Sequence, residues 1–173
     1  MNPKNNLNGF LVIDKPYDMG STKVVSVLKH FLHPTKIGHA GTLDPLATGV
    51  LPIAFGKATR LIPYVMAGKK TYQFTIKWGV ETDSGDLAGK KIATSDKIPT
   101  EDEIQSVLPK FVGEIMQTPS VFSALKVNGK RAYDLAREGR EVEIKPRPVT
   151  IYNLKVLDIL SDNATFEVVC SKG

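Results

Sequence analysis

A segment of strict alternation, KTYQFTIKWG, constrains the fold of this chain more than any other stretch of its sequence. Large apolar side chains occupy every second position: Tyr72, Phe74, Ile76 and Trp78. Polar side chains stand between them: Thr71, Gln73, Thr75 and Lys77. A period of two is the pattern of a β-strand with one buried face. The segment therefore predicts a strand in a sheet that needs a covering layer on one side.

Other segments have helical periodicity. Ser21 is expected to be the N-cap of a helix whose apolar residues recur at spacings of three and four. A second helix should begin after Thr100, because Thr100 and Glu103 fit a capping box. Further strands are expected at residues 9–14, 148–160 and 165–173, and VNGK at residues 127–130 predicts a hairpin turn. Strands and helices mix without regular alternation, which favours an α+β fold over a doubly wound sheet.

Composition narrows the class of protein. At 173 residues the chain suits one domain with a real core. It has neither an apolar run long enough for a membrane span nor a signal-peptide pattern, so a cytoplasmic protein is expected. Cys170 is the only cysteine, which excludes an internal disulfide and multi-cysteine zinc sites. Its apolar neighbours predict a buried structural thiol.

The charge is mildly basic, with a net charge of +5 and a pI of about 9.2. Lysines and arginines cluster between Lys126 and Arg147. Such a cluster fits a solvated surface, and it also fits a patch that binds phosphates by releasing their counterions. Charge alone does not separate these two interpretations.

The stretch from Lys36 to Leu61, KIGHAGTLDPLATGVLPIAFGKATRL, is rich in glycine and too apolar for an ordinary solvent loop. Its GKAT motif is not a phosphate loop, because Leu51 replaces the required first glycine and Ala58 follows the lysine. No GxGxxG element follows a strand, and no serine lies in a GxSxG elbow. A two-carboxylate glycosidase would need a second acid placed opposite the first.

What remains in this stretch is one carboxylate, Asp44. Pro45 disfavours a helical conformation at Asp44, and the surrounding glycines permit tight turns. These features predict a rigid loop that presents Asp44 to a ligand. The alternative is an Asx-type turn, in which the aspartate hydrogen-bonds its own backbone.

Several motifs together resemble one family. They are VIDKP, GHAGTLDPLATGVLPI, KATR, KTYQ, TDSGD, PSVFSALKVNGKRAYDLAREG and CSKG. In this order, from about Gly9 to Gly173, they resemble the bacterial TruB-type tRNA pseudouridine synthases. The resemblance implies a mixed, mainly antiparallel sheet with flanking helices. It also implies isomerisation of uridine 55 to pseudouridine in the T loop of tRNA.

The resemblance assigns roles to four residues. Asp44 matches the family's catalytic aspartate, and His39 matches a position beside the flipped-out substrate. Tyr72 matches the tyrosine that stacks on the target base, and Arg60 matches a basic position near the site. A fifth residue, Lys15 of the DKP motif, is expected to pack beneath the catalytic loop rather than to react.

The resemblance also implies a partner. Residues 119–142 match an insertion that grips the RNA stem-loop, so Lys126, Lys130 and Arg131 are expected to bind RNA. The isomerisation breaks and remakes bonds of a single uridine, so neither a cofactor nor a metal is expected. The T stem-loop of tRNA is the expected partner, with no membrane and no protein partner implied.

One departure from the family pattern concerns the end of the chain. Family members continue past CSKG with an arginine that pairs with the catalytic aspartate, with further strands of the sheet, and with a small RNA-binding domain. The chain is therefore expected to be the N-terminal portion of the catalytic domain, with little or no turnover alone. A non-catalytic RNA-binding fragment and, more distantly, a hydrolase that uses Asp44 at a sugar C1′ are the alternatives.

Overall fold

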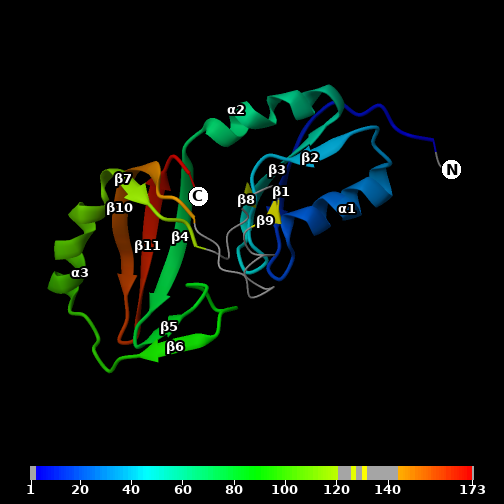
Figure 1. Ribbon diagram of the computed structural model, residues 1–173. Helices are drawn as coiled ribbons and strands as arrows, with labels where there is room; N and C mark the ends of the chain where they lie inside the picture. The colour runs from blue at the N-terminus through cyan, green and yellow to red at the C-terminus, as the bar shows by residue number, and fades with distance from the viewer. Residues whose placement is uncertain (1–2, 121–125, 128–129, 132–143, 173) are drawn as a thin grey trace. The chain divides into compact units, whose positions relative to one another are not determined.

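The computed structural model describes residues 3–120, 126–127, 130–131 and 144–172. The chain divides into two compact units, Met1–Gly68 and Lys69–Gly173. Each unit contains antiparallel sheet and helix, which confirms the predicted α+β class (Figure 1). No helix in the described part of the chain is long and apolar enough to cross a membrane.

The first unit is a three-stranded sheet with helical cover. Its elements are β1 (Gly9–Lys15), α1 (Ser21–Leu32), β2 (Ile37–His39), β3 (Gly49–Phe55), the 3-10 helix η1 (Gly56–Leu61) and α2 (Ile62–Ala67). β3 lies between β1 and β2 and is antiparallel to both. Val24 of α1 is buried against Leu51, Ile53 and Phe55 of β3, and this contact forms the core of the unit.

Helix α1 forms where its periodicity predicted and ends at a defined residue. His33 adopts the left-handed conformation, with φ 44° and ψ 47°, and its N–H donates to the carbonyl of Lys29 at 3.1 Å. Pro34 follows and prevents another helical turn. The histidine therefore belongs to the helix terminus.

Strand β3 was not predicted from the sequence, because Pro52 lies in the middle of its segment. Proline is tolerated mainly at sheet edges, since it has no N–H for the ladder. β2 ends at His39, opposite Ile53, so Pro52 lies just beyond the β2 pairing. There the Pro52 carbonyl still accepts a hydrogen bond from the Ala40 N–H at 2.8 Å.

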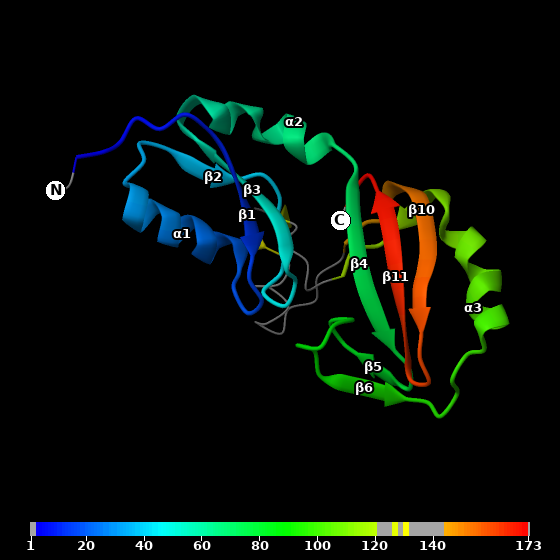
Figure 2. The ribbon, with the colours of Figure 1, turned by 180° about the vertical axis from the view of Figure 1, so that it is seen from behind.

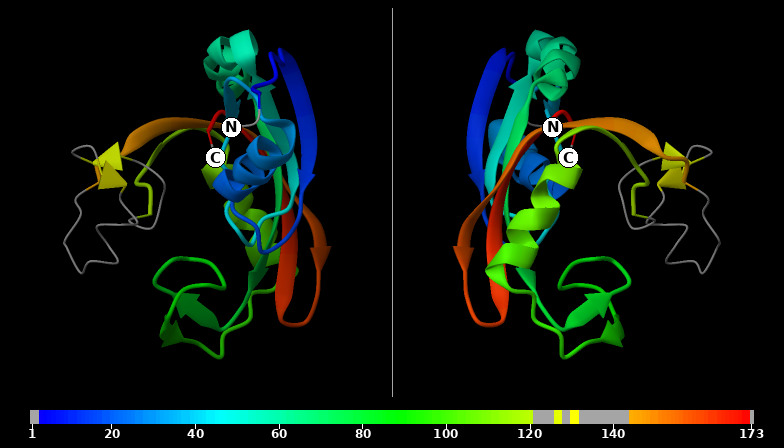
Figure 3. Two further views of the ribbon diagram at one scale, coloured as in Figure 1. Left: turned by 90° about the vertical axis from the view of Figure 1, so that its right-hand side faces the viewer. Right: turned by 90° about the vertical axis from the view of Figure 1, so that its left-hand side faces the viewer.

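The second unit is built on a four-stranded antiparallel sheet. Its elements are β4 (Lys70–Lys77), β5 (Val80–Thr82), β6 (Lys91–Thr94), α3 (Glu101–Val107), the 3-10 helix η2 (Leu108–Phe111), β7 (Gly113–Gln117), β8 (Lys126–Val127), β9 (Lys130–Arg131), β10 (Arg147–Ile159) and β11 (Asn163–Cys170). The order of the main sheet is β4-β11-β10-β7. Figure 2 shows β4, β11 and β10 side by side. β5 and β6 form a separate hairpin that projects from the end of β4 (Figure 3).

The alternating segment forms β4 as predicted. Phe74 pairs with Phe166 of β11, and the two rings stack with centroids 5.4 Å apart. Ile104 of α3 is buried with Ala164 and Phe166, and Trp78 packs against this group. The opposite face carries polar cross-strand pairs such as Thr75 with Thr165, whose hydroxyls lie 2.9 Å apart.

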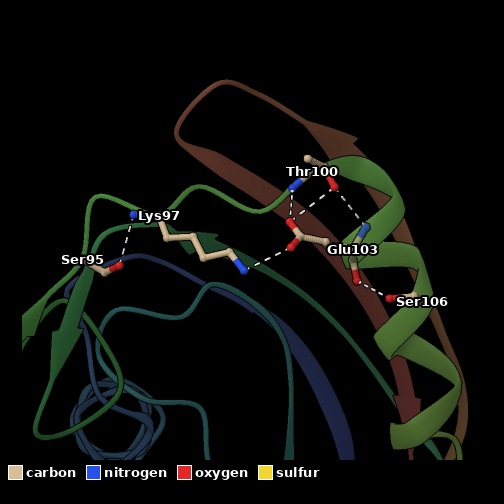
Figure 4. A network of polar contacts seen from close by, with 5 residues as sticks. All are labelled: Ser95, Lys97, Thr100, Glu103 and Ser106. Carbon is tan, nitrogen blue, oxygen red and sulfur yellow. Dashed lines mark hydrogen bonds and ion pairs between the residues drawn. The ribbon is translucent and has the colours of Figure 1, made fainter.

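Helix α3 begins with the predicted capping box (Figure 4). The Thr100 hydroxyl accepts from the Glu103 N–H at 3.2 Å, and the Glu103 carboxylate accepts from the Thr100 N–H at 2.9 Å. Lys97 lies 3.1 Å from the other carboxylate oxygen. The Thr100 N–H, and after it Lys97, lower the pKa of Glu103 below its ordinary value.

An apolar cavity of about 640 Å³ lies between α3 and the sheet of the second unit. Its lining includes Phe74, Ile76, Val107 and Phe111, which are between 38% and 51% exposed. Cys170, at the end of β11, is only 3% exposed, which confirms the expected buried thiol. Burial raises the pKa of that thiol above its ordinary value.

Candidate active site

The loop of residues 40–48 joins β2 to β3 and carries the candidate carboxylate. The loop predicted around Asp44 is thus confined to these residues, and strands and a 3-10 helix occupy most of the rest of the stretch from Lys36 to Leu61. The Ala40–Pro52 hydrogen bond closes the base of the loop. Asp44 lies at its middle and is exposed.

Asp44 does not form the Asx-type turn that was the alternative. Its backbone carbonyl, not its side chain, closes the turn by accepting from the Ala47 N–H at 3.0 Å. Among the residues that the structure describes, none makes a hydrogen bond or ion pair with the Asp44 carboxylate. The carboxylate is therefore not used to hold its own loop together.

Lys15 holds the loop from below, as expected for the DKP motif. The residue is 0% exposed, although a buried ammonium group without partners is very costly. Its Nζ donates to the carbonyls of Met19 at 2.6 Å and Pro16 at 2.8 Å, and more weakly to that of Pro45 at 3.4 Å. Three donors thus meet three acceptors, and the last acceptor belongs to the residue that follows Asp44.

Ser21 holds the other side of the loop, and here the sequence prediction was wrong. Gly20, not Ser21, is the N-cap of α1, and the helix has no side-chain cap. The Ser21 hydroxyl instead donates to the Leu43 carbonyl and accepts from the Leu43 N–H, both at 2.9 Å. A serine cap contributes about 1 kcal/mol to a helix. In α1 that contribution is absent, and the hydroxyl fixes the residue that precedes Asp44.

His39 ends β2 and is half-buried at the base of the loop. Its Nδ1 hydrogen-bonds the carbonyl of Gly41. Because a carbonyl only accepts, Nδ1 carries the proton, and in a neutral ring Nε2 is left as the acceptor. Gly41 has φ 134°, a conformation that side chains disfavour, and so helps the loop to turn back toward the ring.

The remaining candidates lie outside this loop. Arg60 is exposed on η1 of the first unit, and Tyr72 is half-buried on β4 of the second unit, paired with Val168. The structure therefore brings His39, Asp44, Lys15 and Ser21 to one loop, whereas Tyr72 belongs to the other unit.

The predicted RNA-binding residues belong to a short hairpin. Lys126 pairs with Arg131 and Val127 with Lys130, which confirms the hairpin predicted from VNGK. Most of the expected insertion at residues 119–142 lies outside the described residues.

Comparison with known proteins identifies the family. Residues 29–173 match the family model "TruB family pseudouridylate synthase (N terminal domain)". The chain belongs to this family.

Its relatives include proteins named tRNA pseudouridine synthase B. The proteins from Bartonella henselae and Agrobacterium fabrum are each 52% identical over 168 residues, which is 96% of this chain and 53% of theirs. The chain thus spans about half the length of the curated relatives that it matches.

Solved structures share the fold of this chain. One chain of a Cbf5-Nop10-Gar1 complex matches with a TM-score of 0.67 and 32% identity, over 95% of this chain and 40% of that one. A chain of an H/ACA RNP bound to a substrate RNA containing 2'-deoxyuridine matches with a TM-score of 0.63 and 29% identity, over 94% and 37%.

Proposed function

We propose that this chain is the N-terminal portion of the catalytic domain of a tRNA pseudouridine synthase, and that Asp44 is its catalytic carboxylate. The observation that carries the proposal is an exposed carboxylate whose two neighbours in sequence are each held by a buried polar group. The 52% identity to proteins named tRNA pseudouridine synthase B supports the reaction. The proposed target is uridine 55 in the T loop.

The proposed reaction breaks the N1–C1′ bond of uridine, rotates the uracil and joins C1′ to C5. The C5 proton leaves to solvent, and N1 gains a proton, so no atom is oxidised and no water is consumed. Asp44 either attacks C1′ or accepts the C2′ proton during formation of a glycal. A single ionised carboxylate is sufficient for both routes.

The other site residues have supporting roles in this proposal. The target uridine is stacked in a folded T loop and must be flipped out before a side chain reaches its sugar. Tyr72 provides a face for the flipped base, and such stacking is worth about 1–3 kcal/mol. His39 and Arg60 contact the flipped nucleotide and its phosphates, and Lys126, Lys130 and Arg131 bind the stem-loop backbone.

A tritium-release assay tests the reaction. T-loop RNA labelled at C5 of the target uridine is incubated with the complete gene product and, separately, with the 173-residue chain. Release that accompanies pseudouridine in the RNA supports the proposal. Free uracil would instead identify a hydrolase, and RNA binding by both forms without release would identify a non-catalytic RNA-binding module.

The RNA-binding residues are tested by salt dependence. Replacing Lys126, Lys130 and Arg131 together by alanine should weaken binding and reduce the salt slope by about 2 to 3, since each lost phosphate contact removes about 0.7–0.9. A matched triple change of exposed lysines in the first unit, at Lys23, Lys29 and Lys57, should leave the slope nearly unchanged. Equal slopes for the two triple variants would contradict the assignment.

A further inference from the structure

The hydroxyl of Ser21 is an unusual feature of the first unit. Ser21 is 3% exposed and, with Lys15, is one of only two polar or charged residues that are buried among the described residues. Both of its hydrogen bonds go to a single residue, Leu43, which is 22 positions away in the sequence. They engage the N–H and the C=O of that residue, as a neighbouring strand would do.

From this geometry we infer that Ser21 is a positioning residue for Asp44. The inference rests on the proposed function, because it assigns Ser21 a part in the reaction that Asp44 performs. Ser21 touches no reacting atom. It fixes the backbone of Leu43 and thereby the direction in which the next residue leaves the loop.

The arrangement on both sides of Asp44 makes this effect specific. Leu43 is held by Ser21 at the first turn of α1, and Pro45 is contacted by Lys15 at the end of β1. A methyl group on Gly20 would lie 4.0 Å from Cγ of Pro45, so the start of α1 adjoins the same loop. Among the described residues, no hydrogen bond or ion pair holds the Asp44 carboxylate itself. Its direction therefore depends on the residues on either side of it.

A serine at the start of a helix ordinarily caps it, and α1 has no side-chain cap. A local rule is thus broken at the point where the helix meets the candidate catalytic loop. Such departures are expected at functional sites, where positioning takes precedence over local stability. Ser26 of the same helix makes the ordinary hydrogen bond of a serine inside a helix, since its exposed hydroxyl donates to the Thr22 carbonyl at 3.0 Å.

The test is steady-state kinetics of the complete gene product on tRNA with Ser21→Ala. We expect kcat to fall about 10- to 100-fold with KM changed less than about 3-fold, because a misplaced catalytic group costs rate rather than binding. Exchange of the Leu43 amide proton should become at least about 10-fold faster. Ser26→Ala is the matched control and should change neither value more than about 2-fold.

Two further variants separate positioning from folding. Ser21→Thr keeps the hydroxyl and should restore kcat to within about 5-fold of the wild-type value. Ser21→Cys keeps the volume but only a weak hydrogen-bonding group, and should lose kcat as Ser21→Ala does. The comparison of these two variants decides the question even if Ser21→Ala does not fold.

The outcomes distinguish this inference from the proposed function. If Asp44→Asn abolishes the reaction while Ser21→Ala and Ser21→Cys keep the wild-type kcat, the positioning role is overturned and the proposed function stands. If Asp44→Asn is as active as the wild type, the proposed function fails and the positioning role fails with it. Parallel losses in kcat and in the unfolding midpoint for Ser21→Cys would show that Ser21 is only structural.

Discussion

The two units each cover an antiparallel sheet with a helix, but their interiors differ. In the first unit Leu51, Ile53 and Ala54 of β3 are at most 1% exposed, and two polar residues, Lys15 and Ser21, are also buried. In the second unit Phe74 and Ile76 of β4 are 40% and 39% exposed and border an apolar cavity. The first unit buries two whole polar residues. The second unit has buried side-chain nitrogens on Trp78 and Arg147 but no wholly buried polar residue among those described, and the lysines of its described ion pairs are exposed.

This difference shows which part of the molecule is held in place by buried polar groups. Burying a polar group costs free energy unless its partners are well placed, so a buried lysine or serine specifies one local arrangement. In the first unit both buried polar groups hold the loop that carries Asp44. In the second unit the polar pairs, such as Lys155 with Glu167 at 2.9 Å, stabilise a solvent-facing sheet surface. Both wholly buried polar residues of the described chain are therefore used at the candidate catalytic loop.

The largest expected effect is that of Lys15→Met, which keeps the volume of the side chain and removes its ammonium group. Three carbonyls lose their donor, and we expect the free energy of unfolding of the first unit to fall by about 3 kcal/mol or more. The measurement is hydrogen exchange of the β1–β3 amides. Lys155→Met in the second unit is the matched control and should have a much smaller effect. Similar losses for both variants would remove the contrast between the units.

A smaller loss is expected from Gly56→Ala, at the start of η1. Gly56 has φ 55°, and a β-carbon there would overlap the Leu7 carbonyl and lie 2.9 Å from Cγ of Asn8. We expect a loss of about 2–3 kcal/mol, of which about 1 comes from the backbone conformation alone. Gly85→Ala isolates that part, because Gly85 has φ 75° and nothing within 4 Å. An equal cost at both positions would show that Gly56 is not closely packed.

Valine-to-isoleucine substitutions in α1 and α3 should change the free energy of unfolding in opposite directions. Val24→Ile adds a methylene to the closed core of the first unit and should cost about 1 kcal/mol. Val107→Ile adds it at the cavity of the second unit and should gain about 0.5 kcal/mol. Urea unfolding followed by the fluorescence of Trp78, the only tryptophan and a residue of the second unit, measures the second effect directly. A loss at Val107 would mean that the cavity does not accept added volume.

A stability change of similar size is expected at the start of α3. Thr100→Ala removes one half of the capping box and should cost about 1 kcal/mol. Exchange of the Glu103 amide proton should become faster, while that of Leu43 in the first unit should not change. Ser21→Ala should give the reverse pattern, because its hydroxyl serves the loop and not the helix. If Ser21→Ala instead made only the amides of α1 exchange faster, Ser21 would act as a helix cap, as Thr100 does.

The elements that could be predicted from the sequence have strong local signals. β4 follows from the alternation of Tyr72 to Trp78, and the start of α3 follows from Thr100 and Glu103. β3 could not be predicted, because its proline is tolerated only where the neighbouring strand ends, and that is a property of the sheet and not of the segment.

The candidate site was predictable to a similar degree. Asp44 was singled out by Pro45 and the glycines around it, and the family resemblance supplied its role. The resemblance also placed Lys15 beneath the loop. The use of Ser21 could not be foreseen, since a serine before an apolar helix normally indicates an N-cap and its partner Leu43 is remote in sequence.

The central claim is that Asp44 is the catalytic carboxylate of a tRNA-modifying isomerase, and Asp44→Asn tests it most directly. Tritium release from C5-labelled T-loop RNA is measured for the complete gene product with this substitution and with Asp18→Asn. Asp18 is an exposed aspartate of the same unit, with φ 58°, a conformation that asparagine tolerates. We predict that Asp44→Asn lowers the rate about 10³-fold or more, with Asp18→Asn within about 2-fold of the wild type. A rate for Asp44→Asn above about one tenth of the wild-type value would contradict the account.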